Sequence, residues 1–414
     1  MKLRINSKMI SRITLIAILT LGVVSCKNGN SVFDPDYEPS KPNPVITNIL
    51  PEGRYLAGVD SVIVRGENFS SDIDSMTINF GGAPGVIKRA SSRELIVRPG
   101  YKTGDNLDVR VSVRGAEYFS NSFSYTLDSA ETNHPGLSDN YRPVSVFAID
   151  ADESIYGRID IQGSVKFRKI TKNGQVSVYS DTTRFGNYTG AKFGPDGGLY
   201  LISPETPNAA IFRMPPGGNP EGTIDEVWAY PPLNEGAKFY DLVFDGIGHI
   251  WVVGNNTNIY RFTFSDKSIK RYSFTANLRS VFVYENKLYV AGNEPGSVEQ
   301  KVWMFPIDGT GNLGNASEIL NLSGKYQGMI RAINFDSEGN MYLGIVDGDY
   351  GILKVTETGK VLPFYQYVLQ DNYYSLVWDE EGFIIGARRS GANGTLLLNK
   401  IDMFDKERST LYGL

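Results

Sequence analysis

One phrase recurs six times in the second part of the sequence, and it constrains the fold more than any other feature. In each copy an apolar residue, often followed by Asp, precedes a short turn and then an apolar or aromatic run. The copies begin at residues 149, 193, 244, 283, 335 and 378, so they lie 39 to 52 residues apart. Asp and Gly favour the tight turn of a hairpin, and the run after the turn is its second strand. The sequence therefore predicts a series of similar antiparallel units.

Each unit continues with two more predicted strands. A third apolar run follows the phrase, as in 351–355, and a polar turn then leads to a fourth run, as in 357–364. Four strands in about 40–50 residues are typical of a propeller blade. Six such units predict a six-bladed β-propeller over residues 140–414. The phrase resembles that of the NHL and gluconolactonase-like group of six-bladed propellers, and its Asp residues are interpreted as turn formers.

Short alternating strands separated by Gly, Pro and Asn turns fill residues 43–127 and predict a β-sandwich. The segment 44–51, which reads PVITNILP, and the Gly-x-Asn-Phe turn at 66–69 resemble the TIG/IPT family of immunoglobulin-like domains. The fold class is therefore all-β: a TIG/IPT sandwich, a linker at 128–139 and the propeller. We interpret the sandwich as a spacer, because its basic residues are scattered and form no single face for nucleic acid.

The N-terminal segment predicts export and lipid anchoring. Residues 1–12 are basic, and the apolar run from 13 to 24 is too short to cross a bilayer but has the length of a signal-peptide core. Ser25 and Cys26, the one cysteine of the chain, then resemble a bacterial lipobox, in which the cysteine becomes the lipidated first residue. Residues 1–25 are thus a predicted lipoprotein signal peptide. The alternative is an ordinary signal peptide with an incidental cysteine.

Residues 26–42 predict a lipidated cysteine followed by a flexible tether, because the segment has three prolines and little apolar content. Acidic residues at 34, 36 and 38 resemble the export signal of Bacteroidetes-type lipoproteins. The resemblance implies attachment to the outer membrane, with the protein facing the cell exterior. More than one acyl chain on Cys26 would make the anchoring stable.

Composition and charge exclude several classes of function. The formal net charge is −5, and it becomes −9 without residues 1–25, which hold four basic residues and no acidic one. An acidic chain argues against nucleic acid as a partner. A single cysteine excludes an internal disulfide and thiolate metal sites, and the two histidines, His134 and His249, are too isolated to suggest a triad or a metal centre. No cofactor and no metal are expected.

The loops that lead into the predicted innermost strands are rich in Tyr and Arg and would meet on one face of the ring. Aromatic rings stack on the C–H faces of sugars, and guanidinium groups bind hydroxyl groups. The same residue types also favour contacts with another protein, and the tyrosines could instead pack between blades. The predicted ligand-binding residues are Tyr141, Tyr188, Tyr240, Arg279, Tyr326, Arg331, Tyr373 and Tyr374. Arg279 and Arg331 each stand four residues before a repeat, and in the central channel they would oppose a cation and favour an anion.

The combination of lipid anchor, tether, sandwich and terminal propeller resembles surface glycan-binding lipoproteins that accompany Sus-type polysaccharide uptake systems. The resemblance implies a non-catalytic protein that holds a polysaccharide or oligosaccharide near an outer-membrane transporter. One alternative is a scaffold that binds another surface protein. A further alternative is a propeller lactonase or lyase, for which Asp160 and Glu205 are the acid/base candidates.

Overall fold

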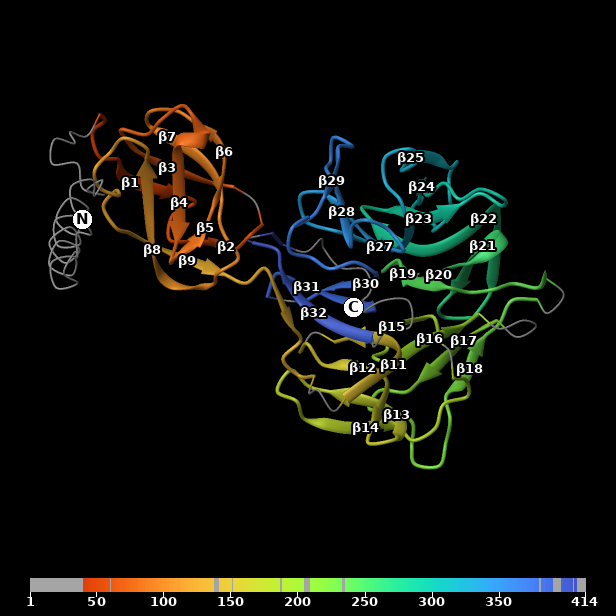
Figure 1. Ribbon diagram of the computed structural model, residues 1–414. Helices are drawn as coiled ribbons and strands as arrows, with labels where there is room; N and C mark the ends of the chain where they lie inside the picture. Colours follow the sequence, from red (N-terminus) through yellow and green to blue (C-terminus); the bar gives the residue numbers. More distant parts are fainter. Residues whose placement is uncertain are drawn as a thin grey trace, which may run out of the picture.

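The chain folds into two β-domains that lie side by side (Figure 1). A computed structural model describes residues 40–59, 61–137, 141–150, 152–186, 188–204, 209–232, 235–379, 381–389, 396–404 and 406–407. The predicted signal peptide, Cys26 and most of the predicted tether lie outside these residues. No helix of membrane-spanning length and hydrophobicity occurs in the described part of the chain.

The N-terminal domain is a sandwich of two sheets. One sheet has the order β1 (Val45–Leu50), β3 (Val62–Glu67), β7 (Glu94–Arg98) and β6 (Val86–Ala90). The other has the order β2 (Arg54–Leu56), β9 (Phe123–Asp128), β8 (Gly104–Val113), β4 (Met76–Phe80) and β5 (Ala83–Pro84). A short 3-10 turn at Ile73–Ser75 precedes β4. Alternate residues of β8, from Leu107 to Val113, are buried between the sheets, as expected for a strand with one face in the core.

The C-terminal domain is a ring of six four-stranded blades, which confirms the predicted fold class. The first blade comprises β11 (Tyr141–Ile149), β12 (Ile155–Ile161), β13 (Ser164–Ile170) and β14 (Val176–Ser180), and the second comprises β15 (Gly190–Phe193), β16 (Leu199–Ser203), β17 (Ala210–Met214) and β18 (Glu226–Ala229). The third comprises β19 (Asp241–Phe244), β20 (His249–Val253), β21 (Asn255–Thr263) and the first part of β22 (Ile269–Tyr284).

The remaining blades follow in chain order around the ring (Figure 1). The fourth comprises the rest of β22 with β23 (Lys287–Asn293), β24 (Lys301–Pro306) and β25 (Ser317–Asn321), and the fifth comprises β26 (Met329–Phe335), β27 (Met341–Val346), β28 (Ile352–Val355) and β29 (Val361–Pro363). The sixth comprises β30 (Tyr373–Trp378), β31 (Phe383–Arg389), β32 (Leu396–Asp402) and β10 (Glu131–Asn133). Strand β22 pairs with β21 through its first half and with β23 through its second, so the third and fourth blades form one sheet.

The Asp residues of the repeated phrase hold the hairpin turns, as their pattern predicts. In the fifth blade, Asp336 Oδ1 accepts hydrogen bonds from the backbone N–H groups of Glu338 and Asn340 at 3.0 and 2.8 Å. The other carboxylate oxygen accepts a bond from the Tyr342 hydroxyl at 3.0 Å. Asp150, Asp245 and Asp379 cap their own turns in the same way. These carboxylates therefore have a structural role in the blades.

The ring closes through a strand that lies in the predicted linker. Strand β10, within 128–139, pairs antiparallel with β32 and supplies the outermost strand of the sixth blade. Glu131 lies opposite Ile401, so the two ends of the propeller are joined by backbone hydrogen bonds. The segment after the sandwich is thus part of the ring, and only a few of its residues connect the domains.

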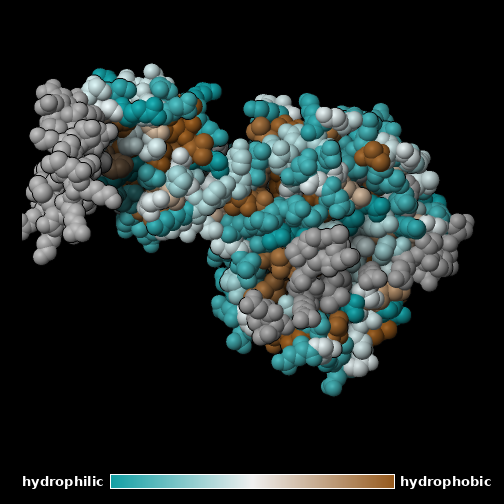
Figure 2. Space-filling model, in the orientation of Figure 1, coloured by the Kyte–Doolittle hydropathy of each residue, from teal (hydrophilic) through white to brown (hydrophobic). Residues whose placement is uncertain are grey.

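An apolar contact fixes the sandwich against the ring. Leu56, Val59 and Ala130 are buried in a small cluster against partly buried residues of the propeller, Tyr365, Val368 and Phe404. Arg54 forms an ion pair with Asp402 of the propeller at 3.7 Å across the same boundary, and a second one with Asp128 of the sandwich at 2.6 Å. Figure 2 shows the two lobes meeting over this narrow region, with a mostly hydrophilic surface on either side. The contact holds the sandwich in one orientation relative to the ring.

Candidate functional site

A cavity opens at one end of the central channel of the propeller. Its volume is about 330 Å³, and the innermost strands of the second to sixth blades, β15, β19, β22, β26 and β30, all contribute to its wall. The lining residues lie at or just before the start of β15, β19, β26 and β30, in the second half of β22, and at the adjoining ends of β31 and β32. We call this cavity the channel mouth. No residue of the sandwich is among its described lining, so that domain leaves it open.

The channel mouth is unevenly charged. Its described lining contains four cationic side chains, Lys192, Arg279, Arg331 and Arg389, and one carboxylate, Asp241. Asp241 accepts hydrogen bonds from the Ser280 hydroxyl at 3.0 Å and from the backbone N–H groups of Val281 and Leu242, both at 2.9 Å. The carboxylate is therefore fixed to the wall by its own strand and by β22.

Burial disfavours the charged forms of the ionisable side chains in this cavity. Desolvation lowers the pKa of the Lys192 ammonium group, although the nearby charge of Asp241 acts in the opposite direction. Desolvation likewise raises the pKa of Asp241, against the effect of Lys192 and of the hydrogen bonds that Asp241 accepts. The pKa of the Arg331 guanidinium is lowered by burial and then by the charge of Arg279. The lowered pKa values of Arg331 and Lys192 both follow from burial, which disfavours the charged form of each group.

Two tyrosine rings hold the arginines in place. The guanidinium carbon of Arg279 lies 3.9 Å from the ring centre of Tyr240. Those of Arg331 and Arg389 lie 5.5 and 5.6 Å from the ring centre of Tyr374. Such cation–π contacts orient a guanidinium plane while leaving its outer N–H groups available. Two tyrosine rings and three guanidinium groups thus lie next to one another at the channel mouth.

Only part of the predicted ligand-binding set meets in this cavity. Tyr240, Arg279, Arg331 and Tyr374 all line it. Tyr188 reaches its edge, but the side chain is 3% exposed and its hydroxyl donates to Asp225 at 2.7 Å. Burial is also the main cause that raises the pKa of Tyr188. The Tyr188 hydroxyl is therefore committed to the second blade.

Tyr373 is fully buried between the fifth and sixth blades. Its hydroxyl donates to Glu131 of the closing strand β10 at 2.5 Å, and burial raises the pKa of that hydroxyl. The ring occupies space left by Gly351 and Gly386, where an added Cβ atom would collide with it. Tyr373 thus packs in the seam, which was the alternative considered for the predicted tyrosines.

The remaining predicted residues lie elsewhere. Tyr326 lines a second hollow of about 580 Å³ beside the fourth and fifth blades, and its hydroxyl donates to the Val361 carbonyl at 3.2 Å. Tyr141 begins β11 opposite Ile161, is half-buried, and is not among the residues that line the channel mouth. Of the proposed acid/base pair, Asp160 lies near the C-terminal end of β12, opposite Arg142, and is not among the residues that line the channel mouth. Glu205 is outside the described residues.

Sequence reasoning missed Lys192 and Asp241 and did not select Arg389. One signal would have found most of the cavity: residues four positions before a repeat occupy one structural position. In five repeats these are Thr189, Tyr240, Arg279, Arg331 and Tyr374, and all of them line the channel mouth. Lys192 and Asp241 follow further along their innermost strands, where side chains alternate between the channel and the neighbouring blades.

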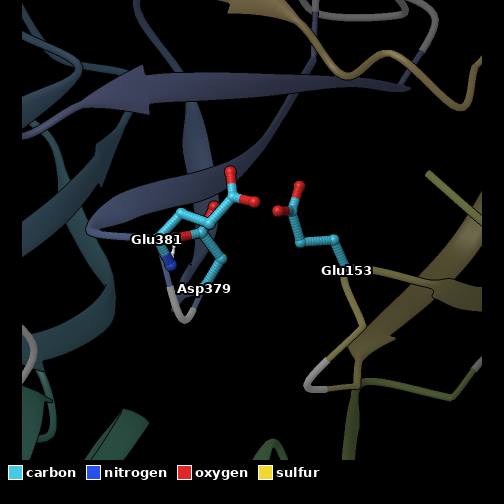
Figure 3. A group of neighbouring side chains, drawn as sticks. All are labelled: Glu153, Asp379 and Glu381. Carbon is cyan, nitrogen blue, oxygen red and sulfur yellow. Dashed lines mark hydrogen bonds between the residues drawn. The ribbon is translucent and has the colours of Figure 1, made fainter.

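A second charged cluster lies in the seam between the first and sixth blades (Figure 3). The carboxylate oxygens of Glu153, Asp379 and Glu381 approach one another within 4.8 Å. The Lys400 ammonium group lies 2.9, 3.2 and 3.1 Å from them. An ammonium group at these distances takes the place that a cation would need, so the cluster is an ion-pair network that joins two blades.

Comparison with known proteins supports the fold of both domains. Residues 44–127 match the family described as the IPT/TIG domain, which confirms the predicted identity of the sandwich. No curated protein sequence is significantly similar to the chain.

Several solved structures share the overall architecture. A protein of Bacteroides thetaiotaomicron named as an auxiliary nutrient binding protein is 15% identical, with a TM-score of 0.51 over 91% of this chain and 100% of that one. A protein of unknown function from the same organism is 15% identical, with a TM-score of 0.50 over 88% and 99% of the two chains. A third, named as a putative phosphatase and also from that organism, is 14% identical, with a TM-score of 0.50 over 90% and 99%. At these identities the likeness concerns the fold, and its extent includes both domains.

Proposed function

We propose that this protein is a non-catalytic glycan-binding lipoprotein of the cell surface and that the channel mouth holds part of a polysaccharide. The observation that carries the proposal is the cluster of two tyrosines and three arginines around a cavity on the propeller axis. The exposed parts of Tyr240 and Tyr374 offer aromatic surface to the C–H face of a sugar. The guanidinium groups beside them donate hydrogen bonds to hydroxyl oxygens.

The size of the cavity restricts how a polysaccharide would bind. A volume of about 330 Å³ is at the lower end of the range of about 300–1,000 Å³ for small-molecule sites. The channel mouth therefore takes a chain end or a short side branch, and the rest of the polymer runs across the loops of the same face. The second hollow, which contains Tyr326, lies on that path as a place for further sugar residues.

The number of carboxylates at the channel mouth argues against glycoside hydrolysis. Glycoside hydrolysis needs two carboxyl groups on either side of the scissile bond. The described lining of the channel mouth offers one, Asp241, and three hydrogen bonds hold it to the wall. A binding site fits this arrangement better than the site of a glycoside hydrolase.

Cell-surface attachment through Cys26 completes the proposal and rests on the N-terminal sequence. The anchor and tether would keep the sandwich and ring outside the outer membrane, near a transporter that imports the captured glycan. The auxiliary nutrient binding protein, which has a similar fold, bears a name that is compatible with this role. Incorporation of labelled fatty acid into the protein, and its loss in Cys26→Ala, would test the anchor.

Affinity gel electrophoresis with plant, fungal and bacterial polysaccharides tests glycan binding. One polysaccharide should retard the protein, and Tyr240→Ala and Tyr374→Ala should each weaken binding about tenfold, because each loses a stacking surface. Tyr118→Ala is the matched control, since Tyr118 is a 63% exposed tyrosine of the sandwich. Absence of retardation by every polysaccharide, or turnover of the bound glycan, would contradict the proposal. In the first case a partner protein would be sought instead.

A further inference from the structure

In the described part of the chain, no carboxylate forms an ion pair with an arginine of the channel mouth, although Asp241 lies near Lys192. Among the described residues, no carboxylate oxygen lies within 4 Å of the guanidinium nitrogens of Arg279, Arg331 or Arg389 or of the Lys192 ammonium group. The Nε atoms of Arg279 and Arg331 are buried and lack a hydrogen-bond partner. Other arginines of the ring have polar partners: Arg213 lies 2.6 Å from Asp196, and Arg168 donates to the Ile159 carbonyl at 3.2 Å. The channel mouth therefore differs from the rest of the propeller.

This arrangement opposes the overall charge of the protein. The chain carries a net charge of −5, yet the described lining of the channel mouth carries four cations and one carboxylate. Like charges in a partly dry cavity repel each other more strongly than in water, because the effective dielectric constant is lower. The effect is visible in Arg331, whose pKa is lowered partly by the charge of Arg279. An anion between these side chains would offset the repulsion and would accept the hydrogen bonds that the guanidinium groups lack.

We infer that the ligand of the channel mouth is a glycan bearing an oxyanion, a carboxylate or a sulfate ester, bound by Arg279 and Arg331. The inference rests on the proposed glycan-binding function and specifies its ligand class. Tyr240 and Tyr374 hold the guanidinium groups while the sugar ring stacks beside them. A planar guanidinium donates two parallel hydrogen bonds to a carboxylate or sulfate, which gives geometric selectivity as well as affinity. Lys192 adds positive charge further along the channel wall.

Titration calorimetry with matched ligands tests the charge requirement in the wild-type protein. The carboxylate arm compares polygalacturonate with its methyl ester, in which the same backbone carries no charge. The sulfate arm compares heparin with desulfated heparin, and starch and β-glucan serve as neutral polysaccharides. We expect one charged glycan to bind at least tenfold more tightly than its neutral counterpart. The preferred arm identifies the oxyanion.

Substitutions then place the anion. Arg279→Gln and Arg331→Gln should each weaken binding of the charged glycan about tenfold or more, and their binding should depend less on salt concentration. Arg114→Gln removes the same charge from an exposed position in the sandwich and is the matched control. Thermal unfolding monitored by circular dichroism shows whether each variant is folded. If a variant fails to fold, the ester comparison in the wild-type protein still decides the charge requirement.

Three results would overturn the inference. Equal affinity for charged and neutral partners would show that charge is not recognised. Binding of a charged glycan that both arginine variants retain within twofold would place the anion elsewhere. In these two cases glycan binding itself would stand. If no glycan of any kind binds, the proposed function fails together with the inference, and the two failures are thereby distinguished.

Discussion

The channel mouth and the seam between the first and sixth blades gather similar charged side chains but balance them differently. In the seam, Lys400 lies within 3.2 Å of Glu153 and Asp379 and also contacts Glu381 at 3.1 Å. At the channel mouth, Arg279 and Arg331 face tyrosine rings and have no such partner among the described residues. Both places are formed by strands far apart in the chain.

The difference separates charges that hold the ring together from charges kept for a ligand. A buried cation with three carboxylates has its desolvation cost offset within the protein, and removing it leaves uncompensated charge. A buried cation without a carboxylate lowers stability until an anion arrives. Stability and ligand affinity should therefore respond in opposite ways to substitutions in the two places, which the following predictions test in order of decreasing effect.

The largest effect is expected from Lys400→Met in the seam. The substitution leaves Glu153 and Asp379 buried beside each other, with only the more exposed Lys172 still in reach, 3.8 Å from Glu153, and breaking a buried pair costs about 3–5 kcal/mol. Urea unfolding followed by fluorescence should show that loss. Lys325→Met, at an exposed position, should change the free energy of unfolding by less than about 0.5 kcal/mol. Equal stability of the two variants would show that the seam network is not structural.

The second prediction concerns His134, which follows the closing strand β10. The side chain is 1% exposed, and its Nδ1 accepts a hydrogen bond from the backbone N–H of Gly136 at 3.1 Å. Desolvation lowers the pKa of His134 from 6.5 to about 4, so the unfolded chain binds a proton before the folded one does. The contribution of the neutral His134 imidazole to the free energy of unfolding is therefore fully present above pH 6.5. It is lost as the pH falls towards 4, and the loss amounts to about 3 kcal/mol.

Unfolding free energies of the wild-type protein and His134→Asn at several pH values between 4 and 7 measure this effect. Other groups titrate in the same range, so the relevant quantity is the difference between the two pH profiles. The wild-type profile should be steeper as the pH falls. Parallel profiles would mean that His134 does not titrate between these limits.

The third prediction sharpens the distinction between adjacent tyrosines. Tyr373→Phe should lose about 2 kcal/mol of stability, because Glu131 loses a buried hydrogen bond to a charged group, while glycan affinity should stay within twofold. Tyr374→Phe should leave stability within about 0.5 kcal/mol, since its hydroxyl has no hydrogen-bond partner within the described part of the chain. Calorimetric titration and urea unfolding of the same samples measure both quantities. A large loss of affinity in Tyr373→Phe would assign that residue to the ligand site.

The smallest effect on stability is expected at the channel mouth. Arg331→Gln should change the unfolding free energy by less than about 0.5 kcal/mol, or raise it slightly, because repulsion with Arg279 is relieved. Arg213→Gln, whose arginine is paired with Asp196, should lose about 1 kcal/mol. Differential scanning calorimetry compares the two variants. A larger loss in Arg331→Gln would show that this arginine has a structural partner.

Much of the fold was predictable because its signals are local. The repeated phrase places an Asp or Gly turn between two strands in five of the six blades, with Glu285 and Asn286 at the turn of the fourth, and the Asp336 hydrogen bonds show why Asp recurs. Strand β10 was not predictable in the same way. Its three residues, Glu-Thr-Asn, carry no apolar alternation, and their pairing depends on β32 near residue 400. A short polar strand that is specified by a distant partner resembles a linker in the sequence.

The candidate site was predictable in part for a related reason. Tyr373 and Tyr374 are neighbours at the start of β30, and adjacent side chains of a strand point in opposite directions. One therefore packs in the seam and the other lines the cavity, a distinction that residue type cannot make. Lys192 and Asp241 were missed because single charged residues within apolar strands give no sign of the direction they face.

The closing strand also determines when the ring can be completed as the protein is made. Residues 131–133 leave the ribosome before any of the six repeats, but Asn399 to Ile401, with which they pair, follow nearly all of them. During that interval β10 is an unpaired edge, which other chains can join. A chain that stops before residue 396 contains the sandwich and five complete blades, yet its ring stays open. Premature termination near the end of translation should therefore yield an aggregation-prone product rather than a slightly smaller propeller.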